Sequence, residues 1–135
     1  MAETLEFELV SPEKLLLSQQ VAMVVVPGGD GDFGVLPRHS LLISTVRPGV
    51  ISVYETRARV SKRIFVAGGF AEVTGQRCTV LAEEAVPVED IDRAKTEQEL
   101  KDAREDLEDA KTDFERDVAA RQVTVLEAKL FALRH

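Results

Sequence analysis

The sequence has little of what several classes of functional site require. Its 135 residues include one cysteine, two histidines and no tryptophan, and aromatic residues make up 5%. One cysteine cannot form an intramolecular disulfide, and two histidines without a second thiol do not make a zinc cluster. So few aromatic side chains disfavour a base-stacking platform or an aromatic ligand cage. We therefore expect no metal site, and we expect Cys78 to be a small core residue.

Positive charge and long apolar runs are also scarce. The chain carries 17 basic and 24 acidic residues, and this net charge of −7 disfavours nucleic acid as a partner. The longest uninterrupted apolar run is Val21–Val26, far short of the ~20 residues of a membrane-spanning helix. The N-terminus, MAETLEFELV, has glutamates where a signal peptide has basic residues. Any association with a membrane is therefore expected to occur through another protein.

Glycine and proline are confined to the first part of the chain. All eight glycines lie between Gly28 and Gly75, all five prolines lie between Pro12 and Pro87, and residues 88–135 contain neither. The charge changes at the same place, from net −2 over residues 1–87 to net −5 over residues 88–135. Such a shift predicts a domain boundary near residue 87.

The first domain has the pattern of short β-strands. Leu5, Phe7 and Leu9 alternate with glutamates, which is the period of a half-buried strand. Further short apolar or β-branched segments lie between turn signals, and no helical period separates them. These predicted segments cover residues 15–17, 22–26, 50–55, 60–67, 70–73 and 78–81, with a hairpin end at 56–59 and a turn at 74–76. The pattern favours an antiparallel sandwich or barrel.

The second domain has the pattern of amphipathic helix, with apolar residues recurring at threes and fours. Asp90 or Asp92 is a plausible N-cap. A single helix of this length would extend ~65–70 Å, too long for one small sandwich to cover its apolar stripe. We therefore expect either two antiparallel helices or one long helix laid on a partner. The apolar stripe shifts phase near residues 114–119, where we expect the bend.

The stretch VVVPGGDGDFG contains the spacing G-x-G-x-x-G at Gly29, Gly31 and Gly34. A dinucleotide site needs the third glycine to open a helix, but Pro37 follows without any helical period. Asp30 and Asp32 would also repel a phosphate, and a calcium loop would need a closing glutamate that is absent. The stretch is interpreted as a glycine-rich turn between strands. Arg38 and His39 lack the companions of a catalytic set, so no enzyme site is predicted.

The chain contains, in this order, FELVSPE at 7–13, GDFGVLPRHSLL at 31–42, RPG at 47–49, GGFAEV at 68–73 and VLAEEA at 80–85. The order and spacing of these segments resemble the epsilon subunit family of bacterial F-type ATP synthases, the counterpart of the mitochondrial delta subunit. The resemblance covers essentially the whole chain. It implies an α+β protein, with an N-terminal antiparallel β-sandwich over residues 1–87 and a C-terminal α-helical hairpin over residues 88–135.

The resemblance implies a non-catalytic rotor part, without a cofactor, at the foot of the central stalk. Its partners would be the gamma subunit and the ring of c subunits. The chain would lie on the cytoplasmic face of a bacterial membrane, and it would not form a homo-oligomer. The stretch Gly31–Asp32–Phe33 matches the family's contact with the c-ring, and His39 matches a histidine near the gamma interface. The family's usual Gly-His-Ala-Pro is here Arg38-His39-Ser40-Leu41, so Arg38 is an added feature of the gamma contact.

In this family the helical tail can extend along the stalk and block ATP hydrolysis through basic residues that meet acids of the catalytic head. The candidates here are Arg116, Arg121, Lys129 and Arg134. The acids among them (Asp113, Glu115 and Asp117) weaken that electrostatic case.

Some members of the family bind ATP on the hairpin through the motif Ile/Leu-Asp-x-x-Arg-Ala. Asp90, Arg93 and Ala94 keep the spacing of this motif, with Glu89 at its apolar position. Two alternatives to the stalk subunit therefore stay open. One is an ATP-sensing regulatory module that uses Asp90 and Arg93. The other is an independent β-sandwich domain with a coiled-coil dimerisation tail, which predicts a stable homodimer.

Overall fold

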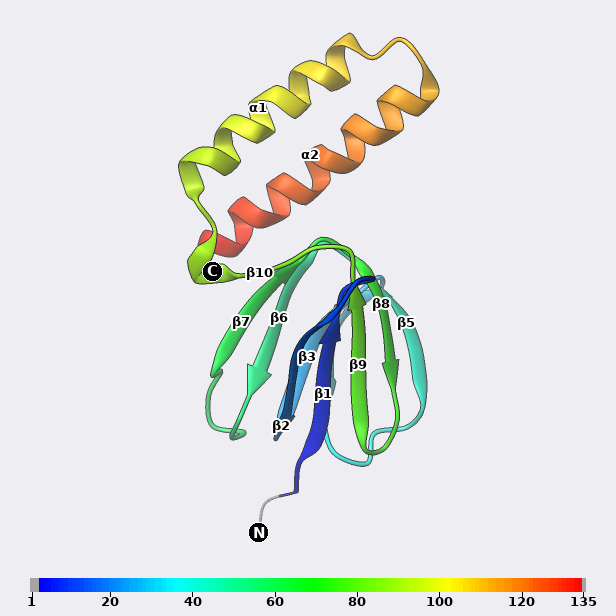
Figure 1. Cartoon of the computed structure of the whole chain (residues 1–135), viewed down its shortest axis with the longest axis vertical. Helices are drawn as coiled ribbons and strands as arrows, with labels where there is room; N and C mark the ends of the chain where they lie inside the picture. Colours follow the sequence, from blue (N-terminus) through cyan, green and yellow to red (C-terminus); the bar gives the residue numbers. More distant parts are fainter. Residues whose placement is uncertain (1–2, 135) are drawn as a thin grey trace. The chain divides into compact units, whose positions relative to one another are not determined.

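The computed structural model describes residues 3–134 of the chain. They form two compact units, which are divided between Pro87 and Val88 (Figure 1). The first unit contains ten strands and the second contains a short 3-10 turn and two helices. The strands are β1 (Leu5–Val10), β2 (Leu15–Val21), β3 (Met23–Gly28), β4 (Gly31–Val35), β5 (Leu42–Val46), β6 (Gly49–Tyr54), β7 (Lys62–Val66), β8 (Gly69–Val73), β9 (Arg77–Ala82) and β10 (Ala85–Pro87).

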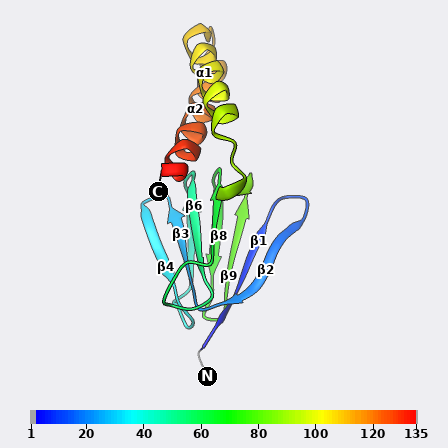
Figure 2. The ribbon, with the colours of Figure 1, turned by 90° about the vertical axis from the view of Figure 1, so that its left-hand side faces the viewer.

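The strands make one curled sheet in the order β10-β7-β6-β3-β5-β8-β9-β1-β2, with β4 paired to β3. β3 and β5 pair only at Gly28 and Val46, so this junction joins two halves that curl around a shared core. β1, β9, β8 and β5 follow one another across the sheet in Figure 1, and Figure 2 shows the β1–β2 and β3–β4 hairpins on opposite sides. The predicted sandwich is confirmed, with one difference: β1 and β9 pair in parallel.

Alternation along the strands builds the core. In β1 the residues Leu5, Phe7 and Leu9 are buried and the residues between them are partly exposed, as the period of two predicts. Cys78 is fully buried in β9, which confirms it as a core residue. The turn at residues 74–76 is also confirmed, because the Thr74 N–H donates to the Arg77 carbonyl oxygen at 2.8 Å.

The glycine-rich stretch is more ordered than a turn. Its turn is limited to Gly29–Asp30, because β3 continues to Gly28 and β4 begins at Gly31. β4 pairs with β3 along its whole length. The prediction therefore missed β4, and it also missed β5 and β10. Glycine and aspartate are poor strand formers, and here the pairing with β3 outweighs that local preference.

The second unit is a helical hairpin made of η1 (Val88–Asp90), α1 (Arg93–Asp109) and α2 (Asp113–Arg134). The two helices run side by side in opposite directions (Figure 1). Asp92, one of the two predicted caps, is the N-cap of α1 and accepts from the Lys95 N–H at 3.1 Å. The hairpin core consists of Leu100, Ala103 and Leu126, with Val123 and Leu130 packed against them.

The predicted bend at residues 114–119 is wrong, because those residues lie inside α2 and α1 ends at Asp109. Thr112 caps α2: its hydroxyl accepts from the Glu115 N–H at 3.1 Å and contacts the Glu115 carboxylate at 3.2 Å. In the second bond the hydroxyl donates to the carboxylate, so both bonds run through the Thr112 side chain, and they fix where α2 begins. The phase shift of the stripe reflects Phe114 and Val118, which are exposed.

Candidate functional site

The outward side of the β5-β8-β9-β1-β2 half carries a row of exposed apolar side chains. Phe70 in β8 pairs with Leu81 in β9, Leu81 pairs with Val10 in β1, and Val10 pairs with Leu15 in β2. Directly paired residues point to the same face of a sheet, so these four form a continuous row, here called the apolar row. Phe70, Leu81 and Leu15 are exposed although they are apolar. A contiguous patch of this kind marks a surface for another molecule.

The apolar row has polar neighbours on the same face. The next row along the strands contains the polar residues Glu72, Thr79 and Glu8, and it begins with the apolar and exposed Ile43. Beyond it, the Arg77 guanidinium lies 3.0 Å from the Glu6 carboxylate and 3.5 Å from that of Glu8. An apolar centre with charged surroundings is the composition of a protein–protein contact.

The loop that contains Arg38 and His39 lies at one end of this half of the sheet. The Arg38 N–H donates to the Gly75 carbonyl oxygen at 2.7 Å, so the loop is fixed to the β8–β9 turn. Arg38 has a φ of 69° and its guanidinium lies 2.5 Å from the Glu3 carboxylate. The His39 Nδ1 donates to the Ser40 carbonyl oxygen at 2.7 Å. These bonds fix Arg38 and His39 in a loop at the β8–β9 turn, which is the end of these strands opposite to the apolar row.

A third surface is the end of the β3–β4 hairpin. The Arg47 guanidinium lies 2.5 Å from the Asp32 carboxylate and donates to the Gly28 carbonyl oxygen at 2.6 Å. A Cβ on Gly28 would stand 2.7 Å from the Gly31 carbonyl oxygen, so the hairpin end requires glycine at that position. Asp32 is therefore a carboxylate in a strand, held by an arginine, and not a residue of a loose turn.

The cysteine, Cys78, lies in the core of the sandwich and not on these surfaces. Burial raises the pKa of the Cys78 thiol to about 12, so this sulfur is a core atom and not a nucleophile. Within residues 3–134 no group of three or more His, Cys, Asp or Glu side chains is placed to hold a metal ion. In the same range, neither helix is long and apolar enough to cross a membrane.

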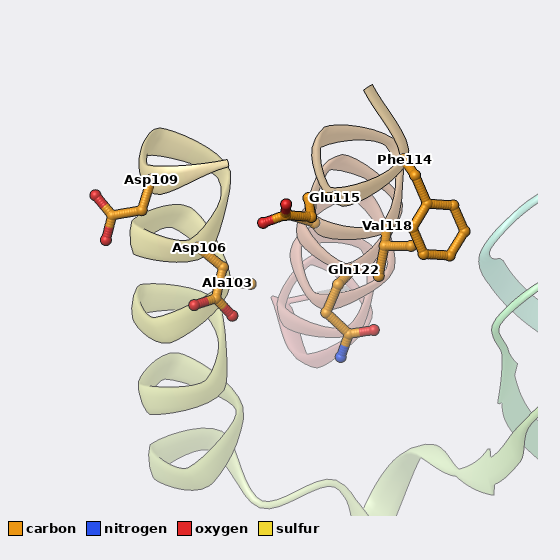
Figure 3. Close-up of a pocket in the computed structure, with 8 residues that line it drawn as sticks. Ala103, Asp106, Asp109, Phe114, Glu115, Val118 and Gln122 are labelled. Carbon is orange, nitrogen blue, oxygen red and sulfur yellow. The ribbon is translucent and has the colours of Figure 1, made fainter. Parts of the chain in front are cut away.

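The end of the helical hairpin where α1 stops and α2 begins forms a groove (Figure 3). Phe114 and Val118 lie next to each other on α2, while Asp106 and Asp109 come from α1 and Glu115 from α2. The remaining lining residues are Ala103, Ala119 and Gln122. Carboxylates on the rim make this groove unsuitable for an anionic ligand such as a nucleotide.

The four basic residues predicted for inhibition do not form one patch in the hairpin. At 100° per residue, Arg116 and Arg134 point in the same direction from α2, whereas Arg121 and Lys129 are each turned about 140° away from that direction. Arg116 is paired with Asp113 at 2.9 Å. A joint contact of all four would therefore have to reach around α2.

The residues predicted for ATP binding belong to two different elements. Asp90 ends η1, Arg93 begins α1, and the N-cap Asp92 stands between them. The requirement that Asp90 and Arg93 share one helical face is therefore not met in this structure. Both residues and Ala94 are exposed.

Sequence reasoning did not identify the apolar row or the role of Arg47. The polar residues Glu72 in β8 and Arg77 and Thr79 in β9 do indicate which face is exposed. The sequence does not show, however, that Phe70 and Leu81 on that face lie beside Val10 and Leu15. Arg47 was visible only as part of a matching segment, because its partners Asp32 and Gly28 are 15 and 19 residues away.

These features define a class: a β-sandwich followed by a helical hairpin, with docking surfaces on the sandwich. The β-sandwich domain of the ATP synthase delta/epsilon chain matches residues 4–88, and the C-terminal domain of the ATP synthase epsilon chain matches residues 92–135. This chain belongs to the delta/epsilon family of ATP synthase subunits, and the resemblance read from the sequence is confirmed.

Individual relatives match over nearly the full length. The chain is 60% identical to the ATP synthase epsilon chain of Rhodospirillum centenum, over 96% of this chain and 92% of the relative. It is 55% identical to that of Rhodospirillum rubrum, over 98% of each. A chain from the mitochondrial ATP synthase of Euglena gracilis, solved as OSCP, F1 and c-ring, has a TM-score of 0.82 at 25% identity, covering 98% of this chain and 82% of that one.

A chain from the central stalk and c-ring of the Tetrahymena thermophila mitochondrial ATP synthase has a TM-score of 0.67. Its identity is 13%, and the match covers 97% of both chains. At this identity the likeness concerns the fold alone.

Proposed function

We propose that this chain is a non-catalytic subunit of the central stalk of an F-type proton-translocating ATP synthase. In this role it turns with the c-ring and, through the gamma subunit, passes the rotation to the catalytic head. Family membership over the full length and the Euglena complex that contains a similar chain support this proposal. The observation that carries it is the apolar row, an exposed face that a free-standing domain has no reason to keep.

The sandwich surfaces divide between the two rotor partners. The gamma subunit covers the outward face of the β5-β8-β9-β1-β2 half, from the apolar row at one end of the strands to the loop with Arg38 and His39 at the other, and it buries Phe70 and Leu81. The c-ring meets the β3–β4 hairpin end at Gly31, Asp32 and Phe33. An acidic group on a fixed hairpin there favours basic side chains on the ring and sets the rotational register more than the affinity.

The helical hairpin supplies the regulatory part of the proposal. When the two helices separate and extend, Arg116, Arg121, Lys129 and Arg134 reach acids of the alpha/beta head and oppose ATP hydrolysis. The small hairpin core is consistent with two packings that differ by only a few kcal/mol. In this scheme the protein is peripheral, on the cytoplasmic face of a bacterial membrane, and joins the membrane only through the complex.

Affinity purification tests the proposal directly. The tagged full-length chain is recovered from gently solubilised membranes, next to a Leu81→Asp variant that places a charge in the apolar row. We expect the alpha, beta, gamma and c subunits with the wild-type chain and much less of them with the variant. Recovery of the chain alone, or as a stable homodimer on a sizing column, would contradict the stalk role and favour a stand-alone domain with a dimerising tail.

A further inference from the structure

Arg47 ties the β3–β4 hairpin end to the corner between β5 and β6. Its backbone N–H donates to the Pro27 carbonyl oxygen at 2.9 Å. Its Nη1 donates to the Gly28 carbonyl oxygen at 2.6 Å, and its Nη2 lies 2.5 Å from the Asp32 Oδ1. One arginine therefore holds both strands of the hairpin, β3 through two carbonyl groups and β4 through a carboxylate.

The surrounding backbone leaves this hairpin end little room to move. The Gly29 N–H donates to the Thr45 carbonyl oxygen at 2.9 Å. A Cβ on Gly49 would stand 3.0 Å from the Pro27 Cβ, so the corner and the hairpin are in close contact. The side chain of Asp32 would otherwise rotate freely, because it is 61% exposed on a strand that pairs only with β3.

We infer that Arg47 is a positioning residue, which holds the Asp32 carboxylate for a cationic group of the rotor partner at this hairpin end. This inference rests on the proposed function. Arg47 occupies Oδ1, and a carboxylate has acceptor sites on both oxygens, so a second cation can bind at Oδ2. Because Arg47 has already fixed the rotamer of Asp32, the partner loses less side-chain freedom on binding.

The Arg47 guanidinium also weakens the attraction between Asp32 and a cation of the partner, because its positive charge partly cancels the negative charge of Asp32. The charged groups of this hairpin end are Asp30 at the turn, Asp32 and Arg47, with a net charge of −1. If cancellation dominates, removal of Arg47 strengthens the contact; if positioning dominates, removal weakens it. The second is the expected result, because Arg47 holds Asp32 Oδ1 directly, while the repulsion between the exposed Arg47 and a cation of the partner is screened by salt.

A double-mutant cycle tests the inference with the full-length chain. Asp32→Asn, Arg47→Met and the double variant compete with labelled wild-type chain for ATP synthase from which this subunit has been removed. We expect each single variant to bind about 3- to 10-fold more weakly. We expect the double variant to be no weaker than Asp32→Asn, because Arg47 acts through Asp32. A purely structural role would weaken binding again in the Asp32→Asn background.

Arg104→Met is the matched control, since Arg104 forms an exposed pair with Glu127 at 3.3 Å on the helical hairpin. We expect this variant to bind like the wild-type chain. Tighter binding of Arg47→Met, or additive effects in the cycle, would overturn the positioning role. Weakening by Asp30→Asn but not by Asp32→Asn would move the contact to the other acid and also overturn it. If the wild-type chain itself does not bind, the proposed function fails first.

Discussion

Gly69 in β8 approaches the backbone of Leu81 in β9 so closely that a side chain at Gly69 would overlap the Leu81 carbonyl oxygen. Gly69 also has a φ of 144°, a conformation that other residues rarely adopt. We expect Gly69→Ala to lower the free energy of unfolding by about 3 kcal/mol or more, because strain and overlap add. Urea denaturation of the full chain measures this loss.

Gly31→Ala separates the two causes of that loss. Gly31 has a φ of 140°, but a Cβ there would meet no heavy atom within 4 Å. We expect a loss of only about 1–2 kcal/mol, from backbone strain alone. Equal losses for the two variants would mean that the contact between β8 and β9 relaxes without cost.

Phe70→Ala removes the aromatic side chain of the apolar row. Phe70 is 58% exposed, so the free energy of unfolding should change by less than about 1 kcal/mol. The affinity for ATP synthase lacking this subunit should fall by about 10-fold or more, as for an aromatic anchor in an interface. Phe114→Ala is the control, because Phe114 is exposed on the helical hairpin. Unchanged affinity of Phe70→Ala would mean that the apolar row is not part of the gamma contact.

The sequence predicts those elements whose pattern is local. The alternation in β1 and the Asp92 cap could both be predicted, since each depends on residues a few positions apart. The start of α2 could also have been read from Thr112 and Glu115, a capping-box pair that stands in the sequence. The apolar stripe instead indicates a bend at residues 114–119, because it includes the exposed Phe114 and Val118.

Features that depend on partners far along the chain were not predictable. β4 contains two glycines and an aspartate, and it is a strand because β3 lies beside it. The apolar row exists only when Phe70, Leu81, Val10 and Leu15 meet across four strands, and one of those pairings is parallel. No period within a single strand contains that information.

The buried thiol of Cys78 gives the stability a pH dependence. Burial raises its pKa from the usual 9.0 to about 12, so the folded state favours the protonated thiol. Its contribution is fully present below pH 9 and is lost as the pH rises from about 9 towards 12. We expect the free energy of unfolding to fall by up to about 1.4 kcal/mol per pH unit in that range.

Comparison with Cys78→Ala isolates this effect, because all other groups titrate in both proteins. We expect the stability difference between wild type and variant to shrink above pH 9, in urea denaturation at pH 8, 9 and 10. A difference that stays constant over these pH values would mean that the thiolate is tolerated in the folded core.

Leu126→Ala should loosen the helical hairpin. Leu126 is 1% exposed and packs with Leu100 and Ala103, and truncating a buried leucine costs about 2–5 kcal/mol. We expect faster amide hydrogen exchange in α1 and α2, with little change in the sandwich, which has its own core. Val118→Ala, at an exposed position, should change little. Equally fast exchange in the sandwich would show that the two units unfold together.

ATP binding provides the last test, because it decides between the stalk role alone and an additional ATP-sensing role. Asp90 and Arg93 lie in different elements, on either side of the cap of α1, and Glu89 next to them would repel a triphosphate. We expect calorimetric titration of the full chain with ATP to show no saturable binding through Arg93. The Arg93→Gln variant should therefore give the same titration curve as the wild-type chain. Saturable binding that is lost in Arg93→Gln and in Asp90→Asn, but kept in Arg104→Met, would contradict this expectation. It would mean that the start of the hairpin rearranges around the nucleotide, since the ligand would have to bring Asp90 and Arg93 onto one face.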